Sequence, residues 1–108
     1  MSTTTQKYDW AGLAGRSYTY WIYPIGTDLK AAPGNYCFAR EITPGVRKAV
    51  YFGQTGDLSE RFDFHHKMGC AKRSGATHTH AHINNGGERA RLSEEADLVA
   101  RHSPPCNG

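Results

Sequence analysis

The residues best suited to chemistry stand in one short stretch, AVYFGQTGDLSERFDFH, which runs from Ala49 to His65. Its first residues are apolar and favour a strand, two glycines then frame a polar turn, and a helical pattern follows. The spacing predicts a helix from Asp57 to Met68, in which Arg61 and His65 are four positions apart and share one face. A guanidinium beside an imidazole, close to Tyr51 of the strand, is suited to binding a phosphate.

A carboxylate that could hold a metal comes from a second predicted helix, Glu88 to His102. The stripe of this helix predicted to face inward is formed by Leu92, Ala96 and Val99. Glu95 lies next to that stripe, whereas Glu94 is predicted to point to solvent. A carboxylate at a buried edge is costly unless it has a partner or a metal. Glu95 is therefore a candidate metal ligand, with an ion pair to Arg61 or a lysine as the structural alternative.

Two tyrosines are predicted to meet across a hairpin. The segments on either side of Pro44-Gly45, a strong turn pair, are rich in strand-forming residues. Pairing around this turn brings Tyr36 close to the Tyr51 end of the partner strand. Both could be ordinary tyrosines of a sheet core, but their convergence together with Arg61 favours a site.

Several motifs, taken in order along the chain, resemble those of the GIY-YIG nuclease family. Gly34-Asn35-Tyr36 stands where the family has Gly-Ile-Tyr, and Tyr51-Phe52-Gly53 stands where it has Tyr-Ile-Gly. Arg61 follows at the family's usual spacing. Glu95 matches the family's metal-binding glutamate, and Asn107 matches its terminal asparagine. By this resemblance Asn107 anchors the chain end or the surroundings of the phosphate, while the polar Asn35 departs from the family pattern.

The resemblance implies a small α+β domain of GIY-YIG type, an antiparallel sheet of three or more strands flanked by helices. It also implies a metal-dependent endonuclease that hydrolyses phosphodiester bonds in DNA, with Mg²⁺, or Mn²⁺ in its place, on Glu95. Arg61 would stabilise the phosphate, and Tyr36 would activate water with support from Tyr51 and His65. From residue chemistry His65 is the alternative base, because imidazole titrates near neutral pH and an unperturbed tyrosine does not.

Other basic and aromatic residues are candidate contacts to nucleic acid. Lys48, Lys72 and Arg73 could bind phosphates, although basic side chains in a solvated loop are at least as common. The net charge of +3 is a mild basic bias that is compatible with nucleic acid. Residues 17–23, SYTYWIY, predict an added strand whose rings could stack on bases or cover one side of the sheet.

Three histidines alternate along the predicted strand 77–83. Alternation places His78, His80 and His82 on one face, which raises the possibility of a zinc site. Neighbouring side chains on one strand face are about 6.5–7 Å apart, which is wide for three ligands of one ion. A polar strand face near the cleft is therefore the preferred interpretation.

The 108 residues suffice for one domain, predicted over 17–108 after a flexible segment 1–16. The three cysteines, Cys37, Cys70 and Cys106, form no CxxC pair, and their odd number favours reduced thiols. No stretch has the length of a membrane span or the pattern of a signal peptide, so we expect a cytoplasmic location and no membrane contact.

A different class of function is a non-catalytic nucleic-acid-binding module that retains the GIY-YIG fold. Such a module has no need of an inward glutamate that repels phosphate, so Glu95 favours the nuclease. Because no separate DNA-binding module is visible, specificity is expected to come from the domain itself or from a partner protein.

Overall fold

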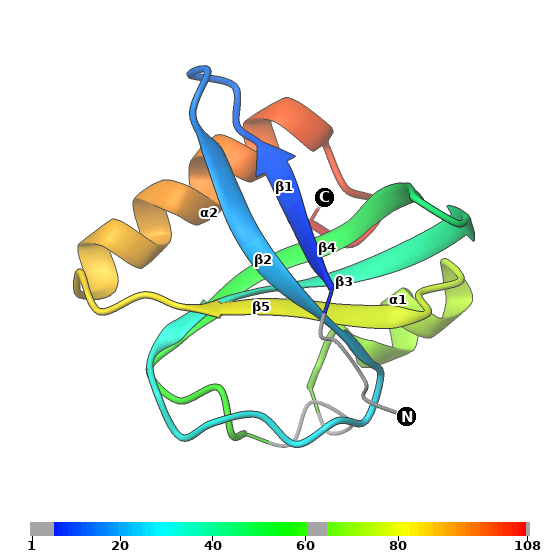
Figure 1. Ribbon diagram of the computed structural model, residues 1–108, viewed down its shortest axis with the longest axis horizontal. Helices are drawn as coiled ribbons and strands as arrows, with labels where there is room; N and C mark the ends of the chain where they lie inside the picture. Colours follow the sequence, from blue (N-terminus) through cyan, green and yellow to red (C-terminus); the bar gives the residue numbers. More distant parts are fainter. Residues whose placement is uncertain (1–5, 61–64, 108) are drawn as a thin grey trace.

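The computed structural model describes residues 6–60 and 65–107, and antiparallel strands dominate it (Figure 1). The five strands are β1 (Lys7–Ala11), β2 (Ser17–Pro24), β3 (Gly34–Thr43), β4 (Val46–Thr55) and β5 (His78–Ile83). They form one sheet in the order β1-β2-β5-β3-β4. The helices are α1 (Met68–Arg73), α2 (Glu88–His102) and the short 3-10 helix η2 (Pro105–Asn107). None of these helices has the length and apolar character needed to cross a membrane.

The predicted α+β class of GIY-YIG type is wrong. Strands take up 40% of the described residues and helices 24%, and the sheet curls into a half-barrel. The cause is the N-terminal hairpin: β1 pairs with β2, and β2 pairs with β5, so two strands extend the sheet beyond the predicted hairpin. The right-handed twist accumulates over five strands and bends the sheet (Figure 1). The segment 1–16, predicted to be flexible, thus contains a strand, which buries Trp10.

The hairpin predicted around Pro44-Gly45 is confirmed. Thr43 pairs with Val46, and Tyr36 pairs with Gly53 farther along the same ladder. Gly45 has a φ of +83°, a conformation that costs glycine little and other residues much. The ladder shifts register between Phe38 and Ala39 and between Glu41 and Thr43, so the turn and these two irregularities together bring the two tyrosine motifs into place.

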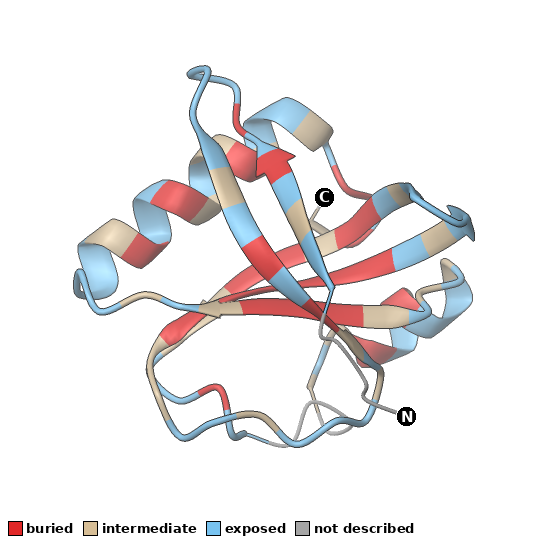
Figure 2. Cartoon of the chain, viewed as in Figure 1, coloured by how far each residue is buried: buried red, intermediate tan, exposed pale blue. Residues whose placement is uncertain are grey.

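The two faces of the sheet carry different helices, and residues alternate between them along β3. Tyr36 and Phe38 pack with Met68 and Ala71 of α1. Cys37 lies on the opposite face, in the cluster that holds Leu98 of α2 and Trp10. Figure 2 shows the buried residues concentrated along the central strands, between α2 on one side and α1 on the other. One sheet thus separates two small cores.

Helix α2 has the predicted bounds but presents a different face to the sheet. Its buried residues are Arg91, Glu94 and Leu98, whereas Leu92 is 44% exposed. The predicted stripe is wrong because it was built from apolar residues alone, and this interface includes buried polar groups. Asn35 explains part of the difference, since its amide donates to the carbonyl oxygen of Arg91 at 2.9 Å.

The helix predicted from Asp57 to Met68 is also wrong. Asp57 accepts hydrogen bonds from the backbone N–H and the hydroxyl of Ser59, which makes a local turn in place of a helix N-cap. Residues 61–64 lie outside the described residues. Among the described residues the helix on this face begins at Met68, where the predicted helix was expected to end.

Candidate active site

Two tyrosines from neighbouring strands form the centre of the candidate site. Tyr36 of β3 is buried and Tyr51 of β4 is half-buried, with ring centroids 6.1 Å apart. Their hydroxyls share a hydrogen bond. Gly53 makes this arrangement possible, because a Cβ added there would lie only 2.5 Å from the Tyr36 ring. The glycine that closes the Tyr-Phe-Gly motif is thus required by the packing of the tyrosine in the other motif.

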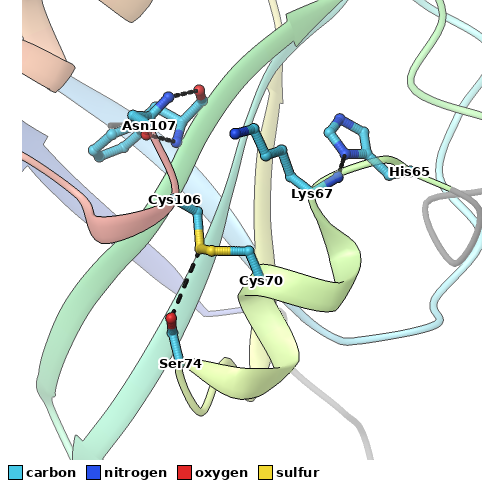
Figure 3. Close-up of a disulfide and its surroundings, with 7 residues drawn as sticks. His65, Lys67, Cys70, Ser74, Cys106 and Asn107 are labelled. Atoms are coloured by element: carbon cyan, nitrogen blue, oxygen red, sulfur yellow. Dashed lines mark hydrogen bonds between the residues drawn. A yellow bond between two sulfur atoms is a disulfide. The ribbon is translucent and has the colours of Figure 1, made fainter.

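His65 joins this pair in a defined protonation state. Its Nε2 lies 2.5 Å from the Tyr36 hydroxyl, and its Nδ1 accepts a hydrogen bond from the backbone N–H of Lys67 at 3.0 Å (Figure 3). A backbone N–H can only donate, so the neutral ring carries its proton on Nε2. The ring therefore donates to Tyr36, and the Tyr36 hydroxyl donates to Tyr51. A directed chain of hydrogen bonds runs from the start of α1 to the half-buried Tyr51.

The surroundings keep all three groups neutral at pH 7. Burial, followed by the neighbouring Tyr51 and then the charge of Glu95, raises the pKa of Tyr36 far above 10. Burial and Glu95 also raise the pKa of Tyr51. Burial and the charge of His66 lower the pKa of His65 below 6.5. Tyr36 does not stand ionised, so a role as a pre-formed tyrosinate base is not supported.

Glu95 acts on the tyrosines and has no compensating partner in the part of the chain that the structure describes. Its carboxylate is half-buried, and desolvation alone raises its pKa. Among residues 6–60 and 65–107 it forms neither a hydrogen bond nor an ion pair. Its charge is close enough to act on both Tyr36 and Tyr51. The predicted approach of Glu95 to the tyrosines is thus present, whereas the alternative of an ion pair with a lysine is absent from the described residues.

Glu94, predicted to face solvent, is instead the buried glutamate. Its carboxylate accepts a hydrogen bond from Tyr20 at 2.6 Å and lies 2.6 Å from the His82 ring and 3.3 Å from the Asn84 amide. Tyr20 and His82 lie on β2 and β5, and Asn84 lies in the segment that follows β5. The two adjacent glutamates therefore have separate roles, since Glu94 is saturated with partners and Glu95 is not.

The residues around Glu95 are compatible with a magnesium ion. Mg²⁺ is commonly held by one or two carboxylates and keeps several waters, so it needs no dense group of protein ligands. No group of three or more metal-ligating side chains occurs in the described parts of the chain, which does not suit structural zinc. The half-buried Glu95 carboxylate, without a counter-charge among residues 6–60 and 65–107, provides the hard oxygen that Mg²⁺ or Mn²⁺ prefers.

Asn107 anchors the chain end to β4. Its side chain accepts from the backbone N–H of Phe52 and donates to the Phe52 carbonyl oxygen, each at 2.9 Å (Figure 3). Since β4 is an edge strand, Asn107 satisfies backbone groups that would otherwise be unpaired. Of the two roles predicted for Asn107, anchoring is the one for which the structure provides contacts.

A disulfide fixes the same chain end. Cys70 of α1 is bonded to Cys106 of η2, and Ser74 lies 3.7 Å from the Cys106 sulfur (Figure 3). The prediction of three reduced thiols is therefore wrong, and only Cys37, buried under α2, is free. The sequence separation of 36 between the two cysteines carries no local signal of pairing, because folding of the sheet brings them together.

The histidine strand has the predicted alternation but no shared ligand. His80 is buried, accepts a hydrogen bond from the Trp10 indole at 3.0 Å, and has its pKa lowered to about 3 by burial, Arg47 and His78. His82 contacts Glu94, and His78 contacts Thr77. Each histidine has its own partner, so the strand contributes to the core and not to a zinc site.

The remaining predicted residues are not part of this cluster. Arg61 lies outside the described residues. Lys48 on β4 and Lys72 and Arg73 at the end of α1 are exposed. Their contact with nucleic acid remains a prediction.

Two basic residues near the site were missed by sequence reasoning. The charge of Lys67 contributes to lowering the His65 pKa, and its side chain extends from the start of α1 toward the chain end in Figure 3. Arg91 is buried and donates to the Gln54 side chain at 3.0 Å. The spacing of four between Arg91 and Glu95 was an available signal, because it places both on one side of a helix.

Comparison of the chain with models of protein families, with curated proteins and with solved structures finds no match. The resemblance to GIY-YIG nucleases therefore rests on the motif residues, of which Tyr36, Tyr51 and His65 form one hydrogen-bonded group, with the charge of Glu95 acting on both tyrosines.

Proposed function

We propose that this protein is a metal-dependent endonuclease that hydrolyses phosphodiester bonds in DNA. One observation carries the proposal: the half-buried Glu95, without a compensating charge in the described residues, stands beside a tyrosine pair oriented by neutral His65. A half-buried carboxylate charge that no cation offsets lowers the stability of the fold. Unfavourable electrostatic arrangements of this kind occur mostly at functional sites. DNA as the substrate follows from the motif resemblance and the mild positive charge.

Each residue has a task that its position supports. Glu95 would hold Mg²⁺, which supplies stabilisation of the charge that develops on the leaving oxygen. The Tyr51 hydroxyl, at the solvent end of the hydrogen-bond chain, donates to a non-bridging phosphate oxygen. Lys67 adds positive charge near the same position, a task that sequence reasoning assigned to Arg61.

Because both tyrosines are neutral, proton transfer during cleavage involves their protonated hydroxyls and no pre-formed tyrosinate. As the water oxygen bonds to phosphorus and the bond to the leaving oxygen breaks, the water's proton passes into the hydroxyl pair of Tyr36 and Tyr51. The proton that Tyr51 held passes to the non-bridging phosphate oxygen that its hydroxyl contacts, and the departing oxygen takes a proton from solvent. His65 holds Tyr36 in place by donating to its oxygen, so the pair relays a proton and does not store an ionised base.

The test of the proposal is cleavage of supercoiled plasmid by the purified protein. With Mg²⁺ or Mn²⁺ present we expect nicked and then linear DNA, which agarose gels separate. A chelator should stop the reaction, and an excess of Mg²⁺ should restore it. The metal requirement follows because Glu95 alone cannot neutralise the phosphate.

The Glu95→Ala variant, purified in parallel, controls for a contaminating nuclease. Cleavage that persists in Glu95→Ala would contradict the assigned site. Binding of DNA without cleavage of plasmid, single-stranded or branched DNA would support the non-catalytic module in place of the enzyme.

The pH dependence of cleavage should show a rise through the acid range and then a plateau. Glu95 must be ionised, and its pKa is raised from 4.5; His65 must be neutral, and its pKa is lowered from 6.5. Both groups reach these states as pH rises, so the rate is lost as pH falls from 6.5 toward 4.5. Rates measured between about pH 7 and 9 should be flat, because both tyrosines stay protonated there.

The variant His65→Ala separates the contributions of Glu95 and His65 to the pH profile. In this variant only the loss of rate caused by protonation of Glu95 should remain. A tenfold rise in rate per pH unit above neutrality would contradict the relay and would assign the base to ionised Tyr36.

A partner protein that supplies specificity is a further part of the proposal, whereas the expected cytoplasmic location conflicts with the disulfide between Cys70 and Cys106. The disulfide is the observation that bears on location, since such bonds persist mainly in oxidising compartments.

A further inference from the structure

A single row of paired residues crosses the whole sheet and passes through the candidate site. Lys7 pairs with Trp21, Trp21 with Ala81, Ala81 with Tyr36, and Tyr36 with Gly53. Directly paired residues point to the same face of a sheet. Trp21 of β2 therefore lies on the same face as Tyr36, two strands away across β5 (Figure 1).

From this row we infer a subsite for one unpaired base of the DNA substrate, stacked on Trp21; the inference rests on the proposed function and deepens it. Trp21 is 39% exposed, although its neighbours Tyr20 and Ile22 are buried on the other face. An exposed indole on the face of the candidate active site provides the apolar surface on which a base can stack.

A pocket surrounds this indole. Its volume is about 610 Å³, within the range of small-ligand sites, and Trp21, Tyr23 and Leu29 line it. Leu58 also lines the pocket and packs in the same cluster as Tyr36. Leu58 thus connects the pocket lining with the core cluster that contains Tyr36.

The charges of the lining fit a nucleotide better than an apolar ligand. The Lys7 ammonium lies 5.2 Å from the centre of the Trp21 ring, and Lys30 also lines the pocket. Among the described residues of the lining Asp28 is the one carboxylate, so the ionic side chains there leave a positive balance. Lysines beside an aromatic platform are the combination that binds single-stranded nucleic acid.

The spacing between strands determines how far the stacked base lies from the phosphodiester bond that is cleaved. Adjacent strands are about 4.8 Å apart, so the backbones of Trp21 and Tyr36 are separated by roughly 10 Å. At about 3.4 Å per stacked nucleotide, this distance places the base within about three nucleotides of the scissile phosphate. A paired and stacked base cannot lay its face on the indole, so the site selects single-stranded or locally opened DNA.

The test is binding of a labelled single-stranded oligothymidylate, and of a duplex of equal length, in chelator so that no cleavage occurs. Fluorescence anisotropy should show that Trp21→Ala weakens binding of the single strand about tenfold, with a smaller effect on the duplex. Trp21→Phe should restore most of the affinity. The double variant Lys7→Ala/Lys30→Ala should reduce the slope of log K against log salt by about 1.4.

Ile42→Ala is the matched control, because Ile42 is a 51% exposed apolar side chain near the hairpin turn, outside the pocket lining. Equal affinities of Trp21→Ala and the wild type, or equal losses in Trp21→Ala and Ile42→Ala, would overturn the inference. So would an equal loss on single strand and duplex. Because these measurements contain no metal, they stand apart from the plasmid assay, whose failure would remove the nuclease but not a base-binding pocket.

Discussion

Glu95→Gln is expected to lower the rate of metal-dependent cleavage by about a thousandfold or more, because an amide holds a divalent cation poorly and several kcal/mol of charge stabilisation are lost. Its free energy of unfolding should be unchanged or slightly higher. Desolvation raises the pKa of Glu95, which means that its charge at neutral pH opposes folding. Plasmid cleavage and urea denaturation measure the two effects.

Glu94→Gln is the matched variant, one residue away on the same helix, and the expected effects are reversed. The new amide would face Tyr20 or His82 with a donor where an acceptor is needed. A buried donor without an acceptor costs about 1–3 kcal/mol, so stability should fall by that amount. Cleavage at temperatures well below the melting transition should be largely retained. Loss of activity in Glu94→Gln with a stable fold would contradict the assignment of the two glutamates.

Removing the disulfide between Cys70 and Cys106 should have the largest effect on stability. The bond closes a loop with a sequence separation of 36, for which the loop-entropy relation gives about 4 kcal/mol. Cys106→Ser, or reduction of the wild type, should lower the urea midpoint accordingly. Cleavage should fall as well, because the bond connects α1, whose first turn follows His65, with the segment in which Asn107 holds β4.

Thiol counting in denaturant provides the control for this prediction. The oxidised protein should have one reactive thiol, that of Cys37, and three after reduction. Three thiols before reduction would contradict the disulfide and would agree with the cytoplasmic location expected from the sequence. An unchanged urea midpoint in Cys106→Ser would show that the bond contributes nothing to stability.

The sequence was most informative where the signal is local. The turn at Pro44-Gly45 depends on the conformations of two residues, and α2 has the bounds that its periodicity and the following Pro104 predict. The turn pair predicted that Tyr36 and Tyr51 approach each other, because their strands are close in the chain. The two register shifts in the ladder, between Phe38 and Ala39 and between Glu41 and Thr43, were not predicted.

The errors arose where a polar group is buried by partners from distant segments. Glu94 was assigned to solvent because an isolated carboxylate is costly to bury, yet Tyr20 and His82 reach it from β2 and β5. Asn35 departs from the family pattern for a similar reason, since its amide holds the carbonyl of Arg91 in α2. Neither contact could be predicted from the residues that neighbour Glu94 or Asn35 in the sequence.

By itself, then, the sequence determined the hairpin, the second helix and the alternating histidine strand. The tertiary structure alone decided that five strands curl into a half-barrel, that Cys70 meets Cys106, and that Glu94 and not Glu95 has hydrogen-bond partners among the described residues. The physical reason is the range of the interactions. Turn and helix preferences act over a few residues, whereas sheet order, disulfide pairing and the desolvation of a carboxylate depend on groups that only the folded chain brings together.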